Sequence, residues 1–294
     1  PDVVVRFGAM PTSKAYRLWL ERTTPRHQVL VDPDSDWADP GATASWIVRC
    51  DPAALCQAVV RRRGGESDAP RSGRFSDGVG RVDREATQRA TRSLDTARFS
   101  EPVAVRALLR ALPEGALLWA GNSMPVRDVD AWLEPGPSAL RVLGHRGANG
   151  IDGTLSSALG ASAAHRGPSV LLCGDLAMLH DLGGLLSASR FALPLVTVVL
   201  DNGGGGIFSM LPVAERIGSE DFDRFFRTPH GLDLERAGAL FGLSARRVSD
   251  EASLVAALHE ALAAERPGLL IVEVDGDAGW AARRAAVAAA GGAA

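Results

Sequence analysis

The chain has 294 residues, of which 46% are hydrophobic and 23% charged, and its formal net charge is −3. This composition is typical of a folded protein of about two domains and excludes a disordered chain. The slight acidic excess offers no basic surface for nucleic acid, and no apolar run approaches the ~20 residues of a membrane span. Three cysteines without metal-binding spacing argue against a disulfide scaffold and a zinc site, so a reducing cytoplasm is the expected compartment.

The first 63 residues alternate between strand and helix patterns. Apolar, β-branched runs predict strands over residues 3–7, 27–31 and 44–48. Helices are predicted from Pro11 onward and over residues 52–62, so the series fits part of an open α/β sheet. Because a strand pattern starts at Pro1 without an initiator methionine, we expect the chain to begin inside a larger protein.

A polar stretch separates this region from the rest of the chain. Glycine, serine, aspartate and arginine dominate residues 64–81, and a polar helical pattern covers residues 83–96. We therefore predict one partial α/β domain over residues 1–63, a linker over residues 64–97 and a ligand-binding α/β domain over residues 98–294.

From residue 98 onward, strands and helices alternate regularly. The predicted strands are 116–120, 140–143, 169–173, 195–200, 245–248 and 269–274. The predicted helices are 103–111, 125–133, 154–165, 179–191, 232–241 and 252–264, followed by an alanine-rich tail over 281–294. The expected fold class is therefore α/β: a doubly wound, mostly parallel sheet flanked by helices, preceded by part of a second α/β domain.

Four consecutive strand ends carry polar, glycine-rich loops. They are 121–127 (GNSMPVR), 144–153 (GHRGANGIDG), 173–176 (CGDL) and 201–206 (DNGGGG). Ligands of open parallel sheets bind beyond the carboxyl ends of the strands, so these loops are expected to meet at one edge.

The last two loops suit a divalent cation. Asp175 and Asn202 end two successive strands and supply side-chain oxygens, and the glycine run after Asn202 supplies a backbone carbonyl. Mg²⁺ prefers such oxygen ligands and completes its shell with phosphate oxygens and water. The spacing therefore favours a Mg²⁺–diphosphate ligand, although Asp175 and Asn202 are also ordinary turn residues at strand ends.

These residues resemble a known family. Gly174-Asp175 followed by Asn202 is similar to the Gly-Asp-Gly…Asn motif of the thiamin diphosphate-dependent enzymes, with Leu176 in place of the second glycine. The four loops together resemble one branch of that superfamily, the 2-succinyl-5-enolpyruvyl-6-hydroxy-3-cyclohexene-1-carboxylate synthase (MenD) family. The motifs extend over residues 99–275, and residues 1–63 resemble the end of that family's middle domain.

The resemblance implies a transferase of menaquinone biosynthesis that depends on thiamin diphosphate and Mg²⁺. Such an enzyme decarboxylates 2-oxoglutarate and adds the succinyl-semialdehyde carbanion equivalent to isochorismate. The resemblance also implies a cytoplasmic homodimer or tetramer with the cofactor at the subunit interface. The glutamate that activates the cofactor would lie in an N-terminal domain, so no catalytic residue is expected in this chain, which alone is expected to be inactive.

The family pattern assigns roles to individual residues. By this resemblance, the Mg²⁺ ligands are Asp175, Asn202 and the carbonyl of Gly204. The other cofactor contacts are Gly174, Leu176 and Ile151, whose side chain would prop the bent cofactor. The substrate contacts are Asn122, Ser123, Arg127, Arg146, Ile207, Phe208 and Leu211. Some of these residues also fit structural roles. Ser123 suits a helix N-cap, and Ile207, Phe208 and Leu211 suit core packing.

Lys14 is the one lysine among 32 basic residues. A compact ammonium on a flexible stem reaches a carboxylate without the planar space that a guanidinium needs. Lys14 follows Pro11-Thr12-Ser13, which resembles a substrate-facing loop of the family, and we expect it to contact a carboxylate of isochorismate. An ordinary exposed lysine is the alternative.

Two other functions remain open from the sequence. The first is another thiamin diphosphate-dependent 2-oxoacid enzyme, of the acetolactate synthase or decarboxylase type. The second is a non-catalytic α/β module that binds a ligand. The absence of a GxGxxG motif after the first strand argues against a dinucleotide as that ligand.

Overall fold

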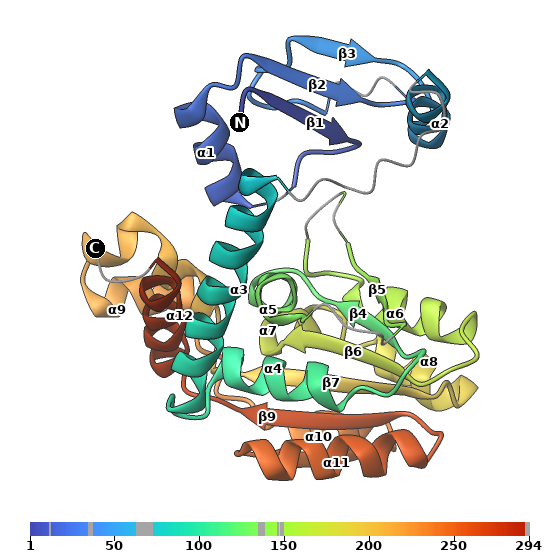
Figure 1. Ribbon diagram of the computed structural model, residues 1–294. Coiled ribbons are helices and arrows are strands. Elements are labelled where there is room, and N and C mark those ends of the chain that lie inside the picture. Colours follow the sequence, from blue (N-terminus) through green and yellow to red (C-terminus); the bar gives the residue numbers. More distant parts are fainter. Residues whose placement is uncertain are drawn as a thin grey trace. The chain divides into compact units, whose positions relative to one another are not determined.

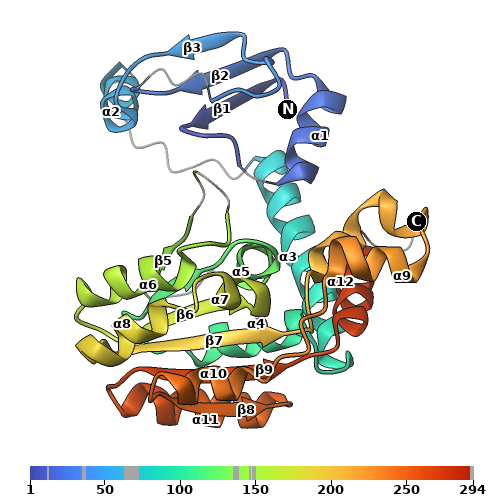
Figure 2. The ribbon, with the colours of Figure 1, turned by 180° about the vertical axis from the view of Figure 1, so that it is seen from behind.

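Two units make up the part of the chain that the computed structural model describes, which is residues 1–11, 13–34, 38–62, 73–134, 139–145, 147 and 150–291 (Figures 1 and 2). The units are Pro1–Asp77 and Gly78–Ala294. The boundary between them falls inside the segment 64–97, and helix α3 (Arg74–Asp95) occupies most of the described part of that segment.

The first unit contains a three-stranded parallel sheet in the order β1-β2-β3. Its elements are β1 (Val3–Phe7), α1 (Lys14–Thr23), β2 (His27–Val31), β3 (Trp46–Val48) and α2 (Pro52–Arg62). Helix α1 begins at Lys14, three residues after the predicted start, because the Ser13 hydroxyl caps it by accepting the N–H of Tyr16. The apolar core of this unit is small and includes Leu20, Leu30 and Val31.

The second unit is built on a six-stranded sheet in the order β5-β4-β6-β7-β9-β8. Every neighbouring pair is parallel. The strands are β4 (Leu117–Ala120), β5 (Arg141–Leu143), β6 (Ser169–Gly174), β7 (Leu195–Asp201), β8 (Ser244–Val248) and β9 (Gly268–Glu273). The predicted α/β class and parallel sheet are therefore confirmed, and the apolar runs of β6 and β7 are buried at the centre of the sheet.

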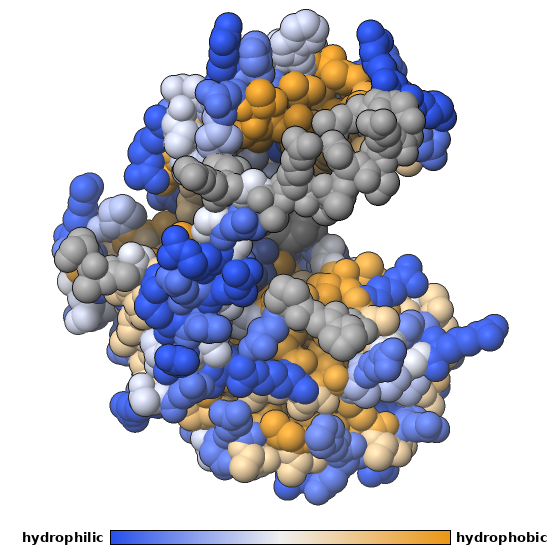
Figure 3. Space-filling view, in the orientation of Figure 1, coloured by the Kyte–Doolittle hydropathy of each residue, from blue (hydrophilic) through white to orange (hydrophobic). Residues whose placement is uncertain are grey.

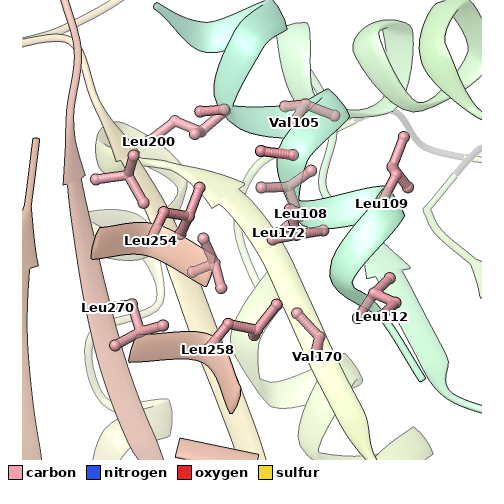
Figure 4. Close-up of a cluster of buried hydrophobic side chains, with 14 of the residues drawn as sticks. Val105, Leu108, Leu109, Leu112, Val170, Leu172, Leu200, Leu254, Leu258 and Leu270 are labelled. Atoms are coloured by element: carbon pink, nitrogen blue, oxygen red, sulfur yellow. The ribbon is translucent and has the colours of Figure 1, made fainter. Parts of the chain in front are cut away.

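Helices cover both faces of this sheet (Figures 1 and 2). They are α4 (Glu101–Ala111), α5 (Met124–Trp132), α6 (Thr154–Ala163), α7 (Asp175–His180), α8 (Gly184–Phe191), α10 (Leu234–Leu240), α11 (Glu251–Ala263) and α12 (Gly276–Gly291). One hydrophobic cluster joins α4, α5 and α11 to the strands, and Figure 4 shows side chains of α4 and α11 meeting those of β6, β7 and β9. A second cluster joins α6, α7, α8 and α10 to the opposite face.

Helix α3 begins at Arg74, inside residues 64–81, which were predicted as a polar linker. Two other stretches also differ from the sequence prediction. Residues 179–191 form parts of two helices, α7 and α8, instead of one. The break is stabilised by Asp181, whose carboxylate accepts the backbone N–H and the hydroxyl of Ser156. The other stretch, for which no helix was predicted, forms the short helices η1 (Gly206–Met210), η2 (Pro212–Glu215), α9 (Ser219–Phe222) and η3 (Asp223–Arg227).

The surface mixes hydrophilic and apolar residues. On the face of the second unit drawn in Figure 3, hydrophilic residues surround the apolar ones. The more exposed large apolar side chains, such as Phe191, Phe225 and Leu240, lie on separate elements. Within the described residues, no helix combines the length and the apolar character that crossing a membrane requires.

Candidate functional site

The order of the strands creates a switch point between β4 and β6. The chain passes from β4 outward to β5 and then returns to the other side of β4 with β6. The register pairs Ala120 of β4 with Leu172 of β6, and Gly174 of β6 with Leu200 of β7. The carboxyl ends of these three strands therefore lie at a common level, and such a switch point is where open α/β sheets bind ligands.

A pocket of about 470 Å³ opens at this point. The strand ends supply its floor and the following loops its walls. Eleven of the residues assigned by resemblance line it: Asn122, Ser123, Arg127, Ile151, Gly174, Asp175, Leu176, Asn202, Gly204, Ile207 and Phe208. The structure thus brings together residues that are separated by as many as 86 positions along the chain.

Asp175 is a buried acid of the pocket, with 2% of its surface exposed. It is the first residue of α7, and its carboxylate accepts the N–H of Leu176 at 2.6 Å and that of Gly204 at 2.7 Å. Burial raises the pKa of Asp175 to about 6, because the loss of solvation outweighs these hydrogen bonds and the nearby His230. A bound cation would offset that penalty.

His230 supports Asp175 from the loop before α10. Its Nε2 lies 3.3 Å from Asp175 Oδ2 and 3.8 Å from Asp201 Oδ1. The three residues could hold a metal by geometry alone. However, His230 Nδ1 accepts the N–H of Leu232 at 3.0 Å, so Nε2 carries the hydrogen and donates it to Asp175. His230 therefore orients the carboxylate and has no lone pair left for a metal.

The glycine run after β7 links Asp175 to a second side-chain oxygen, that of Asn202. The N–H of Gly204 points between Asp175 Oδ2 and Asn202 Oδ1, which lies 3.1 Å from it. Gly204 has φ +144°, and a Cβ there would lie 2.3 Å from the carbonyl oxygen of Arg227. Gly205 donates its N–H to that same oxygen at 2.7 Å. Only glycine lets η3 support the loop this closely.

The donor set fits a magnesium ion bound to a diphosphate. Asp175 and Asn202 present a carboxylate and an amide oxygen, which are hard ligands that Mg²⁺ prefers. Both oxygens converge on Gly204, and the cavity beside them has room for a phosphorylated ligand. The side chains of this pocket are therefore compatible with the cation that the sequence predicts.

Asn122 and Ser123 form the wall at the end of β4. Asn122 is buried and donates from Nδ2 to the carbonyl of Gly150 at 2.6 Å, which holds the loop that carries Ile151. Ser123 occupies the N-cap position of α5, but its side chain makes no capping hydrogen bond. Its φ of +71° is unusual for a residue with a side chain, and backbone strain of this kind clusters at functional sites.

The other predicted substrate contacts differ in their positions: Arg127 lines the pocket, whereas Leu211 does not. Arg127 is exposed on α5, and its Nη1 donates to the carbonyl of Ser123 at 2.6 Å. Leu211 is exposed after η1 and does not line the pocket. Lys14 is exposed at the start of α1 in the first unit. Arg146 lies outside the described residues.

Sequence reasoning missed two neighbours of the predicted ligands. Glu101, at the start of α4, lines the pocket and accepts a hydrogen bond from Asn202. His230 contacts Asp175 from 55 residues away. Glu101 resembles an ordinary acid in the first turn of a helix, and only its low exposure of 3% in the structure distinguishes it.

Part of the second unit matches the sequence model of a known family. The sequence model described as "Thiamine pyrophosphate enzyme, C-terminal TPP binding domain" matches residues 131–274. Thiamine pyrophosphate is another name for thiamin diphosphate. The matched range lies inside the second unit and includes the ends of β6 and β7.

Curated relatives extend the similarity to nearly the whole chain. The chain is 38% identical over 281 residues to the 2-succinyl-5-enolpyruvyl-6-hydroxy-3-cyclohexene-1-carboxylate synthase of Bacillus pumilus, covering 94% of this chain and 46% of that protein. Against the synthase of the same name from Myxococcus xanthus the identity is 41% over 283 residues, covering 93% and 45%. The chain spans about half the length of these relatives. It therefore belongs to the thiamine pyrophosphate enzymes and carries their C-terminal TPP binding domain.

Proposed function

We propose that this chain supplies the diphosphate- and Mg²⁺-binding part of a 2-succinyl-5-enolpyruvyl-6-hydroxy-3-cyclohexene-1-carboxylate synthase. The full enzyme would decarboxylate 2-oxoglutarate and join the remaining four-carbon unit to isochorismate, in menaquinone biosynthesis. The pocket at the ends of β4, β6 and β7 carries the proposal, because its oxygen ligands suit Mg²⁺ and the relatives have that name. The cytoplasmic location and the homodimer or tetramer expected from the sequence stay predictions.

The residues of the chain would share the work as follows. Asp175, Asn202 and the Gly204 carbonyl hold the cation, Gly174 and Leu176 border the diphosphate, and Ile151 supports the rings of the cofactor. When bound, thiamin diphosphate supplies a carbon nucleophile and a sink for the electrons released on decarboxylation. Ile207 and Phe208 of η1 help to exclude water from the pocket that they line.

The three basic candidates suit substrates rich in carboxylates. Arg127 stands at the pocket rim with one guanidinium nitrogen bound to Ser123, which leaves other donors of the fork for a carboxylate. Lys14 is proposed to bind isochorismate, and Arg146 to bind a substrate carboxylate, on the family resemblance alone.

The identity of the ligand is the first prediction. In titrations, the full-length protein is expected to bind thiamin diphosphate only when Mg²⁺ is present and not to bind NAD. It is expected to release CO₂ from 2-oxoglutarate and to consume isochorismate, and this chain alone is expected to show no turnover. Preference for pyruvate would indicate the acetolactate synthase or decarboxylase type, and binding without turnover by the full-length protein would indicate a non-catalytic module.

The substrate contacts give a second prediction. In the full-length enzyme, Arg127→Ala is expected to lower kcat/KM by about 2–5 kcal/mol, because it would leave a desolvated carboxylate unpaired. Lys14→Ala is expected to raise KM for isochorismate while decarboxylation of 2-oxoglutarate stays unchanged. Arg190→Ala, an exposed residue of α8 that does not line the pocket, is the matched control and should change neither. An Arg127→Ala effect below about tenfold would show that Arg127 is an ordinary surface residue.

A further inference from the structure

Three side chains from distant elements meet behind Asn202. Glu101 of α4 and Asp128 of α5 are buried, and Arg283 of α12 lies between them. Arg283 donates from Nη2 to Glu101 Oε2, and it binds Asp128 through Nε at 2.9 Å and Nη2 at 2.5 Å. This network joins the C-terminal helix of the described chain to the two helices that flank the pocket.

Glu101 has a second contact, which faces the pocket. Its Oε1 accepts a hydrogen from Nδ2 of Asn202, while Oδ1 of Asn202 accepts the N–H of Gly204 at 3.1 Å. An asparagine amide has nearly the same shape when it is turned by 180°, so its partners decide which way it points. Here the Glu101 carboxylate accepts from the amide nitrogen and the Gly204 N–H donates to the amide oxygen, so both partners favour the same orientation.

The space around the amide is also restricted. A Cβ on Gly206 would lie 2.6 Å from Asn202 Nδ2, and a Cβ on Gly276, at the start of α12, would lie 3.6 Å from Asn202 Cβ. A side chain at position 206 would therefore clash with the amide, and Gly276 packs against Asn202 from the other side at an ordinary contact distance. Movement of Asn202 to a different rotamer is hindered by the same packing.

We propose that Glu101 is a positioning residue for the cation site: it fixes the Asn202 amide so that Oδ1 faces Asp175 and Gly204. Arg283 in turn fixes Glu101, because it binds the carboxylate oxygen that Asn202 does not use. The proposal rests on the proposed Mg²⁺ site and adds residues to it that neither the spacing of the motif nor the family pattern assigns. Partners of this kind around metal ligands control the orientation of the ligands.

Glu101→Gln is the informative change because it is nearly isosteric. The Glu101 carboxylate accepts from two donors, Asn202 and Arg283, on opposite oxygens. A glutamine has one carbonyl oxygen, so its own N–H₂ group must face one of those donors. The hydrogen bond with the charged Arg283 is the stronger of the two, so the glutamine oxygen keeps it and the N–H₂ group faces Asn202. The Asn202 amide then has to turn over, and it presents Nδ2 to the cation. Nδ2 carries hydrogens and cannot act as a ligand.

The test is a Mg²⁺ titration of the full-length protein at fixed, saturating thiamin diphosphate, followed by calorimetry. Glu101→Gln is expected to raise the Mg²⁺ concentration at half-saturation by about 10–100-fold. Asp128→Asn is the matched control, because it weakens the same Arg283 cluster without touching Asn202. It is expected to lower the melting temperature but to leave the Mg²⁺ half-saturation within about twofold of wild type.

A double variant provides the rescue. Asn202→Asp alone places two carboxylates face to face and should also weaken Mg²⁺ binding. In Glu101→Gln combined with Asn202→Asp, the new amide can donate to the new carboxylate and accept from Arg283. The double variant should therefore bind Mg²⁺ about tenfold more tightly than Glu101→Gln alone.

The outcomes separate this inference from the proposed function. If wild-type protein binds Mg²⁺ and thiamin diphosphate but Glu101→Gln binds them equally well, the positioning role is wrong and the function stands. Equal losses in Glu101→Gln and Asp128→Asn, or no recovery in the double variant, would mean that the cluster only stabilises the fold. If wild-type protein does not bind the pair, both proposals fail.

Discussion

Asp175→Asn is expected to abolish Mg²⁺-dependent binding of thiamin diphosphate. The carboxylate is the charged ligand of the proposed site, and it also accepts the N–H groups of Leu176 and Gly204. Loss of one charged, buried ligand is expected to weaken metal binding by at least about 100-fold. Calorimetric titration of the full-length protein measures this directly, and an unchanged affinity would remove Asp175 from the metal site.

Without the cation, Asp175 makes the stability of the folded chain depend on pH. Burial raises the pKa of Asp175 from 3.8 to about 6, so the folded chain holds this proton more tightly than the unfolded chain. The contribution of Asp175 to stability is therefore present below pH 4 and is lost as the pH rises through about 6, a change of about 3 kcal/mol.

Asparagine does not titrate, so Asp175→Asn should remove that part of the pH dependence. Urea unfolding of both proteins at pH 4 and pH 7, without Mg²⁺ or thiamin diphosphate, measures the difference in the free energy of unfolding. We expect the wild type to lose about 2 kcal/mol more than the variant between these pH values, because at pH 4 part of the full change has already occurred. Parallel pH profiles would mean that the Asp175 carboxyl has an ordinary pKa in the folded chain.

Local sequence patterns predicted most of the fold. The apolar runs of β6 and β7 and the alternation with helices indicate a parallel sheet, because such strands must be covered on both faces. The helix prediction over 179–191 was wrong because the break depends on a tertiary contact, that of Asp181 with Ser156. The segment from η1 to η3 has no clear period, so its short helices could not be predicted from periodicity.

The pocket could be located from the sequence because its residues follow the ends of strands. Parallel topology brings such ends together, so Asp175 and Asn202 were expected to be neighbours. The side chains that hold them could not be predicted in the same way. Glu101 is 101 residues from Asn202, and Arg283 is 182 residues from Glu101, so no local pattern connects them.

The glycine run adds a steric requirement that spacing alone does not reveal. Gly203 and Gly204 both have a positive φ, +78° and +144°. A Cβ on Gly203 would meet nothing within 4 Å, whereas a Cβ on Gly204 would lie 2.3 Å from the carbonyl oxygen of Arg227. An alanine at position 203 would therefore have backbone strain alone, whereas an alanine at position 204 would have backbone strain and a clash with Arg227.

Gly204→Ala is expected to lose cofactor binding and to destabilise the second unit. Backbone strain costs about 1–3 kcal/mol, and the overpacking against η3 adds a similar amount. The Arg227 carbonyl has to move, which breaks its hydrogen bond with Gly205 and shifts the N–H of Gly204 away from Asp175. Gly203→Ala is the matched control: it should cost about 1–2 kcal/mol and still bind Mg²⁺ and thiamin diphosphate. Urea unfolding and calorimetric titration of both variants test the difference, and equal behaviour of the two would mean that η3 does not hold the loop in place.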